Sequence, residues 1–414
     1  MSGRRTKRCS ASPVDNLILT SDLTGGGAES VTYIMADHLS RGHCVAFSNK
    51  NKTRLRNCSL LVMPNILPKS RIFVTLRNLL RLVIVQWQKI RYLPATTISH
   101  LEGPNFLNIL TWGGGRRLLF VHNSPTRNYD NTNLSNVLKK YLIQCLYKRA
   151  SVIVGVSTEI CRELIVDYGV DSKKVVFVPN PIDVEKITNL SREPYGDWRD
   201  EFLSREYIIC VASLTPQKNH SLLIDAFSIL KKKFPGLKLV LVGIGQNEAT
   251  LVEQCSNLKL EVVSNAEAID GRYGDVYMVG FQSNPYPLIA NSRALILTSL
   301  WEGLPIILLE ALALRVVPVV SNCSSGIRYI MFGTQDCDLE EQRNQGLIES
   351  KFGLVVDSRN DGPEQVEIWA GAIEYALLGS SKRQSWIRES QKRIQEFDIK
   401  NIVEIWRKLG LEIS

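Results

Sequence analysis

The sequence predicts an α/β protein with two doubly wound, Rossmann-like parallel-sheet domains that face a central cleft. Short apolar, β-rich runs alternate with helical segments along almost the whole chain, which is the pattern of parallel sheets. The alternation starts a second time after a polar interval at residues 190–206. A length of 414 residues fits two such domains and leaves enough chain to bury a core in each.

The first domain is expected over residues 14–184, after a basic tail at residues 1–13. Residues 16–21 (NLILTS) predict a strand that leads into three glycines and then into a helical pattern, the order strand, glycine turn, helix. Further β-rich runs in this domain are CVAFSN, RRLLFVHNS and SVIVGVS.

The second domain is expected over residues 185–397, where YIICVAS, LKLVLVG, VYMVG, RALILTS and VVPVVS alternate with helical segments. Residues 381–410 have apolar positions three and four apart and are predicted to be helical throughout. The last part of this helix, at about residues 398–414, is expected to pack back onto the first domain.

Composition excludes several classes of protein. The chain is 44% hydrophobic and 22% charged with a mean hydropathy of −0.04, which excludes collagen-like, coiled-coil and disordered chains. Its nine cysteines include no C-x-x-C pair, which favours buried thiols in a reducing compartment over a zinc site or a disulfide framework. Because residues 1–13 lack the apolar stretch of a secretory signal, we expect a cytoplasmic protein.

Charge is unevenly distributed. Residues 1–150 hold 22 Lys and Arg against 6 Asp and Glu, a net +16, whereas the remainder carries −7. Such an asymmetry indicates an anionic partner, although a solvated basic face is the alternative. Within this half, residues 71–93 mix apolar residues with Arg71, Arg77, Arg81, Lys89 and Arg91, which suits a helix on an anionic membrane surface or a core helix with a basic exposed side. No nucleic-acid-binding motif occurs.

The most informative segment follows the predicted strand that ends at residue 299. Glu302 and Gly303 lie in a loop, Pro305 suits the first helical position, and Glu310 stands inside an apolar helix. A buried carboxylate accepts hydrogen bonds only, so Glu310 suits the vicinal hydroxyls of a ribose. Amides after Gly303 can bind phosphate or sugar oxygens. The alternative is a capping glutamate at 302 and a solvent-facing or salt-bridged glutamate at 310.

These residues resemble a known family. Glu302 and Glu310 match the E-x7-E signature of retaining GT-B-fold glycosyltransferases of the family 4 type, also called glycosyl transferases group 1. Other segments agree in order, and they are residues 25–29, 156–157, 178–183, 214–219, 242–245, 280 with 284–285, and 325–326. Each segment is weak alone, but the ordered combination is specific.

The resemblance implies a role for each matched residue. Glu310 would hold the nucleotide ribose, Glu302 would contact the donor sugar, and Lys218 would neutralise the diphosphate leaving group. The remaining positions of the donor site would be Gly303, Leu304, Pro305, Ser213, Gly243, Gly280 and Asn284. Without the resemblance, Lys218 is an ordinary exposed turn lysine.

Three further residues belong to the first domain. Gly26 and Gly27 would let the backbone approach the donor diphosphate or the acceptor, or simply form a tight turn. His122, which follows RRLLFV, matches a position near the reacting sugar in relatives, although a lone histidine at a strand end also serves as a structural hydrogen-bonding group.

The sequence departs from the family at two places. Relatives have an arginine, which also binds diphosphate, where this chain has Ser213, so a residue such as Arg293 or Arg328 substitutes for it or activity is weaker. Relatives also carry a glutamate where this chain has Tyr329.

The expected function is transfer of a hexose or N-acetylhexosamine from a nucleotide-diphosphate sugar, most simply a UDP-sugar, to a glycan or lipid-linked glycan acceptor. This fits cell-surface polysaccharide biosynthesis (capsule, O-antigen or lipopolysaccharide) at the cytoplasmic face of an anionic membrane. No metal or other cofactor is expected, because a lysine and amide dipoles can stabilise the leaving group.

Other functions fit less well. A nicotinamide dehydrogenase needs a third glycine where the chain has Ser30, and a P-loop enzyme needs a G-K-[ST] motif. A metal-dependent GT-A transferase would use Asp336 and Asp338, but these lie in a polar acidic stretch. A GT-B-fold nucleotide-sugar epimerase, a phosphorylase or an inactive membrane-associated scaffold stays open.

Overall fold

The computed structural model describes residues 14–23, 26–48, 55–63, 71–128, 134–194, 206–264, 273–333, 346–357 and 363–413. They belong to two compact units, Met1–Pro179 with Ile402–Ser414, and Asn180–Asn401. Sequence reasoning put the corresponding limits at residues 184 and 397. The basic tail, the first of the three glycines after β1 (residue 25) and the acidic pair at 336 and 338 lie outside the described residues.

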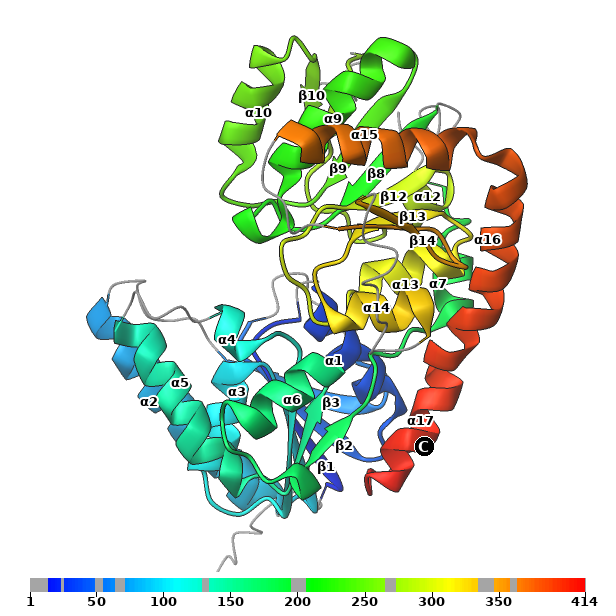
Figure 1. Ribbon diagram of the computed structural model, residues 1–414. Coiled ribbons are helices and arrows are strands. Elements are labelled where there is room, and N and C mark those ends of the chain that lie inside the picture. Colours follow the sequence, from blue (N-terminus) through cyan, green and yellow to red (C-terminus); the bar gives the residue numbers. More distant parts are fainter. Residues whose placement is uncertain are drawn as a thin grey trace, which may run out of the picture. The chain divides into compact units, whose positions relative to one another are not determined.

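The first unit contains a sheet of seven parallel strands in its described part (Figure 1). The strand order is β3-β2-β1-β4-β5-β6-β7. The strands are β1 (Asn16–Thr20), β2 (Gly42–Ala46), β3 (Cys58–Val62), β4 (Thr96–His100), β5 (Arg116–Val121), β6 (Val152–Gly155) and β7 (Val175–Phe177). β1 is fully buried along its length, as expected for a parallel strand covered on both faces.

Helices cover this sheet. They are α1 (Gly27–His38), α2 (Arg71–Tyr92), α3 (Glu102–Leu110), α4 (Pro125–Asn128), α5 (Leu134–Leu146), η1 (Tyr147–Arg149), α6 (Thr158–Val166) and η2 (Ser172–Lys174). α3 packs on β1, β4 and β5 and contacts both α2 and α5, whereas α1 packs on β1 and β4 and α6 on β6 and β7.

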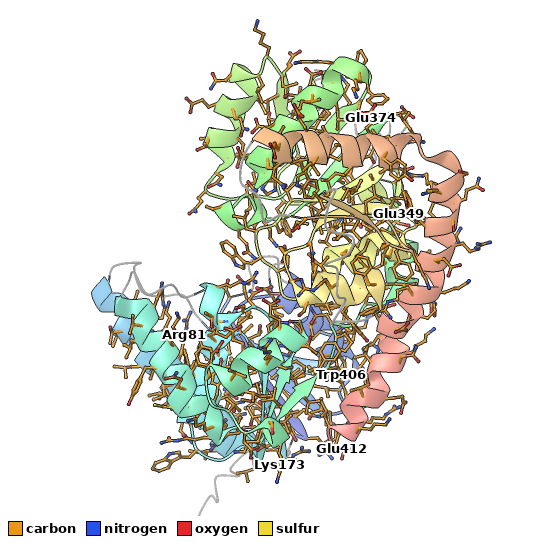
Figure 2. All side chains as sticks on the ribbon, viewed as in Figure 1. Arg81, Lys173, Glu349, Glu374, Trp406 and Glu412 are labelled. Carbon is orange, nitrogen blue, oxygen red and sulfur yellow. The ribbon has the colours of Figure 1, made fainter. Side chains whose placement is uncertain are left out.

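The end of the chain returns to the first unit through α17 (Ile399–Lys408) and the residues after it. Arg116 donates to the carbonyl of Leu409 at 2.8 Å, and the side-chain amide of Asn16 donates to that of Glu412 at 3.2 Å. Trp406, labelled in Figure 2, is fully buried. The final residues are therefore hydrogen-bonded to the start of β1.

The second unit contains eight strands among the residues that the structure describes, in the order β10-β11-β9-β8-β12-β13-β15-β14. The strands are β8 (Tyr207–Val211), β9 (Lys238–Val242), β10 (Val262–Ser264), β11 (Val276–Met278), β12 (Ala294–Leu297), β13 (Pro318–Ser321), β14 (Leu347–Glu349) and β15 (Leu354–Val356). All pairs are parallel except β14 with β15 at one edge.

Helices lie on both faces of the second sheet, with α9 and α15 on one and α12 and α13 on the other (Figure 1). The helices of this unit are α7 (Val184–Leu190), η3 (Pro216–Lys218), α9 (His220–Lys233), α10 (Glu248–Asn257), α12 (Tyr286–Ala290), α13 (Ile306–Ala313), α14 (Ser325–Phe332), α15 (Pro363–Leu378), α16 (Ser380–Arg393) and η5 (Ile394–Phe397). Alternate strand residues such as Ile208, Cys210, Leu239 and Leu241 join the core under α9 and α15.

The predicted fold class, two parallel-sheet α/β domains, is confirmed. Two local predictions are wrong. The terminal stretch is not one helix, because Asp398 is extended (ψ 138°) and pairs with Ile182, which separates η5 from α17. Pro305 caps α13 and is not its first residue. β3, β4, β7, β10, β14 and β15 are additional strands that the pattern of apolar runs did not indicate.

Within the ranges described above, none of the helices combines the length and apolar character that crossing a bilayer requires.

Candidate active site

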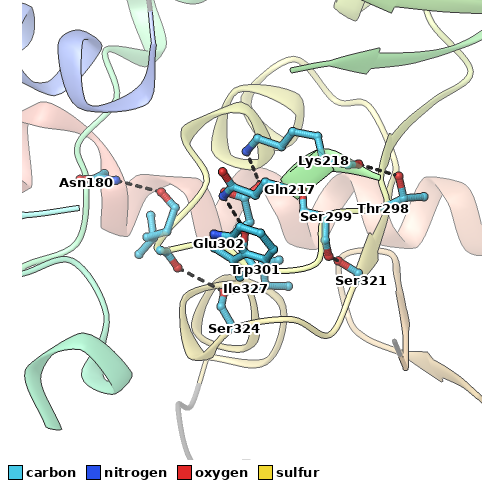
Figure 3. Close-up of polar contacts among 12 residues, drawn as sticks. Asn180, Gln217, Lys218, Thr298, Ser299, Trp301, Glu302, Ser321, Ser324 and Ile327 are labelled. Carbon is cyan, nitrogen blue, oxygen red and sulfur yellow. Dashed lines mark hydrogen bonds and ion pairs between the residues drawn. The ribbon is translucent and has the colours of Figure 1, made fainter. Parts of the chain in front are cut away.

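Two predicted residues of the second unit, Lys218 and Glu302, meet at the carboxyl edge of its sheet, where doubly wound sheets bind ligands (Figure 3). Lys218 ends η3, after β8, and Glu302 lies in the loop after β12. The Lys218 ammonium donates to Glu302 Oε1 at 2.5 Å, and the Ser299 hydroxyl donates to the same oxygen at 2.6 Å. The two predicted residues, 84 positions apart, thus form one ion pair.

Both side chains of this pair are largely buried, Glu302 at 7% exposure and Lys218 at 19%. All the described bonds to Glu302 end on Oε1, which leaves Oε2 for a ligand hydroxyl. An ammonium has three donors, and the described side-chain bond uses one of them. The pair can therefore bind a neutral sugar and an anionic group at the same time.

Hydrogen bonds to backbone carbonyls hold the two loops together. Gln217 donates to the carbonyl of Trp301 at 2.8 Å, and the Leu300 amide donates to the carbonyl of Gln217 at 2.8 Å. Thr298 donates to the carbonyls of Lys218 and Asn219 at 3.0 and 2.9 Å. The two loops that carry Lys218 and Glu302 are thus hydrogen-bonded to each other.

The loop that precedes α13 is held from two sides. The buried amide of Asn180 donates to the carbonyl of Leu304 at 2.8 Å, and Ser324 donates to that of Gly303 at 3.2 Å (Figure 3). Gly326 must be glycine, because a Cβ there would lie 1.9 Å from the Gly303 carbonyl oxygen. Leu304 is buried, whereas Pro305 caps α13.

Glu310 is 9% exposed inside α13, between buried leucines and alanines. Its Oε1 accepts a hydrogen bond from the Tyr286 hydroxyl at 3.0 Å. Burial raises the pKa of Glu310 to about 7, and the Tyr286 bond acts in the opposite direction. Among the described side chains, no Lys or Arg pairs with Glu310, so the carboxylate is neither solvent-facing nor neutralised by a cation.

The other predicted donor-site residues lie on nearby loops of the same sheet. Ser213, exposed, follows β8. Gly243 has φ +148° and packs so closely on the Ala212 carbonyl that a Cβ would lie 2.0 Å from its oxygen. Gly280 accepts from the Gly243 amide at 2.9 Å. Asn284 donates to the carbonyl of Leu190 at 2.9 Å.

Only one of the two proposed substitutes for the missing arginine lies at this edge. Arg293 precedes β12 at the amino edge and sits 3.8 Å from Glu206, so its position excludes it. Arg328 lies on α14, after the carboxyl end of β13, and donates to Asn322 Oδ1 at 3.2 Å.

In the first unit, His122 directly follows β5 and is 6% exposed. Its Nε2 is 3.0 Å from Nδ1 of His100, which ends β4 and is fully buried. Burial and the neighbouring imidazole lower the pKa of His100 well below its usual value. Gly26 caps α1 and Gly27 begins it, beside Glu29, whose pKa is raised by burial.

Two residues in contact with the predicted site were missed, Tyr286 on Glu310 and His100 on His122. The signal for His100 was a second histidine at the end of the β-branched segment TTISH (residues 96–100), which the pattern of apolar runs did not indicate as a strand. The signal for Tyr286 was an aromatic residue directly after the Asn-Pro pair at 284–285.

Comparison with known proteins finds two family models that match the chain. The model of Glycosyltransferase Family 4 matches residues 25–186, and that of Glycosyl transferases group 1 matches residues 198–333. The chain is 26% identical over 388 residues to the N-acetylgalactosamine-N,N'-diacetylbacillosaminyl-diphospho-undecaprenol 4-alpha-N-acetylgalactosaminyltransferase of Campylobacter jejuni, covering 92% of this chain and 95% of that protein. An uncharacterized glycosyltransferase of Methanocaldococcus jannaschii is 27% identical over 305 residues, 70% of this chain and 71% of the other.

Solved structures show the same fold. Anabaena HepE in complex with UDP-glucose superposes with a TM-score of 0.70 at 16% identity, covering 95% of this chain and 99% of the other. WaaG, a glycosyltransferase involved in lipopolysaccharide biosynthesis, gives 0.68 at 13% identity with the same coverage. Family models over both halves, relatives along most of the length and this fold lead to one conclusion: the chain is a glycosyltransferase of the GT-B fold and belongs to the family described as Glycosyltransferase Family 4 and Glycosyl transferases group 1.

Proposed function

We propose that the chain is a retaining glycosyltransferase that moves a hexose or N-acetylhexosamine from a UDP-sugar to a glycan or lipid-linked glycan acceptor in cell-surface polysaccharide biosynthesis. The observation that carries this proposal is the Lys218–Glu302 pair at the carboxyl edge of the second sheet. The Campylobacter relative, whose name gives a diphospho-undecaprenol acceptor, supports the acceptor class. HepE in complex with UDP-glucose supports the donor class.

The chemistry assigned to the pair follows from its charges. When the bond from the anomeric carbon to the diphosphate oxygen breaks, negative charge develops on the diphosphate. The Lys218 ammonium is suited to stabilise that charge, while Glu302 holds the ammonium in place and offers Oε2 to a sugar hydroxyl. Removing the ammonium therefore acts on the transition state as well as on binding.

Arg328 is the residue to which we assign the second cationic contact with the diphosphate, because it lies at the correct edge and Arg293 does not. Glu310 is assigned to the ribose and His122 to the sugar region. We propose that no metal takes part, and turnover is therefore expected to persist in excess EDTA.

The proposal includes contact of α2 with a membrane surface. On α2, exposed apolar residues recur every three or four positions, at Leu76, Leu79, Leu80, Val83, Trp87 and Ile90, with exposures between 39% and 63%. Trp112, 80% exposed, is joined to this helix through Gln86, whose side chain exchanges two hydrogen bonds with the Trp112 backbone. Such an apolar stripe with tryptophans suits the interfacial region of a bilayer.

The basic residues contribute less than their spacing in the sequence indicates. Lys89 is buried, and Arg81 is partly buried with its guanidinium 4.5 Å from the ring of Phe47. Arg91 is exposed over Trp87 and can reach a lipid phosphate. The side chain of Arg71 lies outside the described residues. We therefore propose peripheral attachment through the apolar stripe, with anionic lipid as a secondary factor.

The test of the transferase proposal is a donor screen with UDP, GDP and ADP sugars, followed by an NMR assay of released nucleotide and product anomer. We expect UDP-sugar turnover with retention, weaker nucleotide binding in Glu310→Ala, lower turnover in Glu302→Ala and loss of both in Lys218→Ala. Lys382→Ala is the matched control, because it breaks an exposed ion pair of 2.6 Å in the same unit. Normal donor turnover in all three site variants would refute the assignment.

The assay also separates the alternatives. An epimerase would change the stereochemistry of the sugar without transferring it, and a phosphorylase would need inorganic phosphate. For the membrane contact, a Val83→Asp, Trp87→Asp double variant is expected to lose flotation with anionic vesicles. Val166→Asp, at an exposed valine of α6, is the control and should float like the wild type. Equal flotation of all three proteins would reject the apolar stripe.

A further inference from the structure

The bond between Tyr286 and Glu310 is a feature of the donor site that the family signature does not describe. Tyr286 begins α12, Glu310 lies in the middle of α13, and their contact of 3.0 Å joins the two helices. The tyrosine hydroxyl takes only Oε1 of the carboxylate. The second oxygen stays available for the two hydroxyls of a ribose.

Tyr286 is itself fixed. Its backbone amide donates to Asn284 Oδ1 at 3.2 Å, and the side-chain amide of Asn284 donates to the carbonyl of Leu190 and to Glu193. The Asn-Pro pair therefore sets the start of α12 and with it the place of the tyrosine ring. Asn284 acts on the site through Tyr286.

The Tyr286 hydroxyl opposes the effect of burial on the pKa of Glu310. Burial raises the pKa of Glu310, while hydrogen bonding from Tyr286 lowers it, and the balance is about 7. Burial and the nearby carboxylate raise the pKa of Tyr286, so its hydroxyl stays a donor across the working range. A protonated Glu310 would lose much of its ability to accept bonds from ribose hydroxyls.

In the described part of the chain, other charged groups around the pair contribute little to the pKa of Glu310. α7, α16, η5 and β13 pack on α13. Asp183, which caps α7, faces Tyr286 and raises the pKa of its hydroxyl. Gln391 of α16 donates to the carbonyl of Leu312. The remaining charged residues of α7, α16 and η5 are Glu185, Lys186, Lys382, Arg383, Arg388, Glu389, Lys392, Arg393 and Glu396.

We propose that Tyr286 is a positioning residue of the nucleotide site, which orients Glu310 toward the ribose and extends nucleotide binding to lower pH. This inference rests on the proposed function. It does not make Tyr286 a catalytic residue, because the tyrosine acts through the carboxylate.

The expected pH dependence follows from the ionised form being the one that binds. With a midpoint near pH 7, affinity should fall about tenfold between pH 8 and pH 6, and binding at pH 6.5 should release protons. Tyr286→Phe removes the bond that lowers the pKa of Glu310. Its midpoint is therefore expected to move to higher pH.

The experiment is calorimetric titration with UDP-glucose between pH 6 and 8.5, in two buffers of different ionisation enthalpy. UDP-glucose is a suitable probe because its diphosphate is esterified at both ends and carries no group that titrates in this range. Wild type, Tyr286→Phe, Glu310→Gln and Tyr207→Phe are compared. Tyr207 is the matched control, since its buried hydroxyl donates to the Leu288 carbonyl of the same α12 at 2.6 Å.

We expect Glu310→Gln to abolish proton release and Tyr207→Phe to keep the wild-type midpoint. A Tyr286→Phe midpoint equal to that of the wild type would overturn the role of Tyr286 alone, as would uniform weakening at every pH. Absence of proton release by the wild type at pH 6.5 would also overturn it, even if the variant failed to fold. If the wild type bound neither UDP-glucose nor any other UDP-sugar of the donor screen at any pH, the UDP-sugar proposal would be refuted and this inference with it.

Discussion

The burial of Lys89 in the first unit can be tested quantitatively, through the pH dependence of the free energy of unfolding. Lys89 is 1% exposed, and its ammonium donates to the carbonyl and the side chain of Asn108 at 2.8 and 3.0 Å, and to the carbonyl of Thr111 at 3.5 Å. It therefore caps the carboxyl end of α3. Burial lowers the pKa of Lys89 from 10.5 to about 7, and the charge of Arg117 acts in the same direction.

The sign of the effect follows from which state binds the proton. Between pH 7 and pH 10.5 the unfolded chain holds this proton and the folded chain releases it, so the free energy of unfolding rises with pH. The lysine lowers stability by roughly 4 kcal/mol at pH 7 and by about 1.5 kcal/mol at pH 9.5. Lys89→Met removes this titration.

The perturbation is therefore Lys89→Met, with Lys173→Met, at an exposed lysine of η2, as control. Urea unfolding of each protein is followed by tryptophan fluorescence at pH 7.5, 8.5 and 9.5. Relative to Lys89→Met, the wild type should gain about 2.5 kcal/mol over this range, a difference that cancels the titration of all other groups. A constant difference across the three pH values would refute a buried, titrating ammonium.

Three further predictions concern the second unit. Asn180→Ala should lower the free energy of unfolding by about 1–2 kcal/mol and weaken donor binding, because it removes the bond to Leu304; urea unfolding and calorimetry measure both. Gly326→Ala should lower stability by about 2–3 kcal/mol and reduce turnover, because its Cβ meets the Gly303 carbonyl, and wild-type values for both would contradict the assigned contact. His220 is buried without hydrogen-bond partners in the described structure, and its pKa is lowered to about 4, so the folded protein loses stability as pH falls from 6.5 to 4. His220→Leu should abolish up to about 3 kcal/mol of that loss in acid denaturation curves.

The fold could be predicted, and the candidate site residues of the second unit could be selected, because both depend on local signals. Apolar runs between helices indicate parallel sheets whatever the details of packing. Glu302, Lys218 and Glu310 were identified through ordered motifs. That Lys218 and Glu302 bond directly depends on how two loops 84 residues apart rest on each other, which no local pattern encodes.

Lys89 shows why the remainder could not be predicted. α2 carries apolar residues around much of its circumference, so its spacing does not reveal which side faces the core. Packing against α3 turns Lys89 inward and leaves Val83, Trp87 and Ile90 in solvent. The role of Tyr286 could not be predicted for a similar reason. An aromatic residue in a short helix is an ordinary core residue, and only the position of its hydroxyl shows the contact with Glu310.

The return of the last residues to the first sheet has a consequence for biogenesis. Asn16 and Arg116 bind carbonyls of Glu412 and Leu409, residues that leave the ribosome only after the whole of Asn180–Asn401 has been synthesised. During translation of the second half, the first half of the chain therefore lacks these contacts. Chains that are released from the ribosome a few codons early would therefore be cleaved by proteases in the first unit, which was synthesised first, rather than in the second unit.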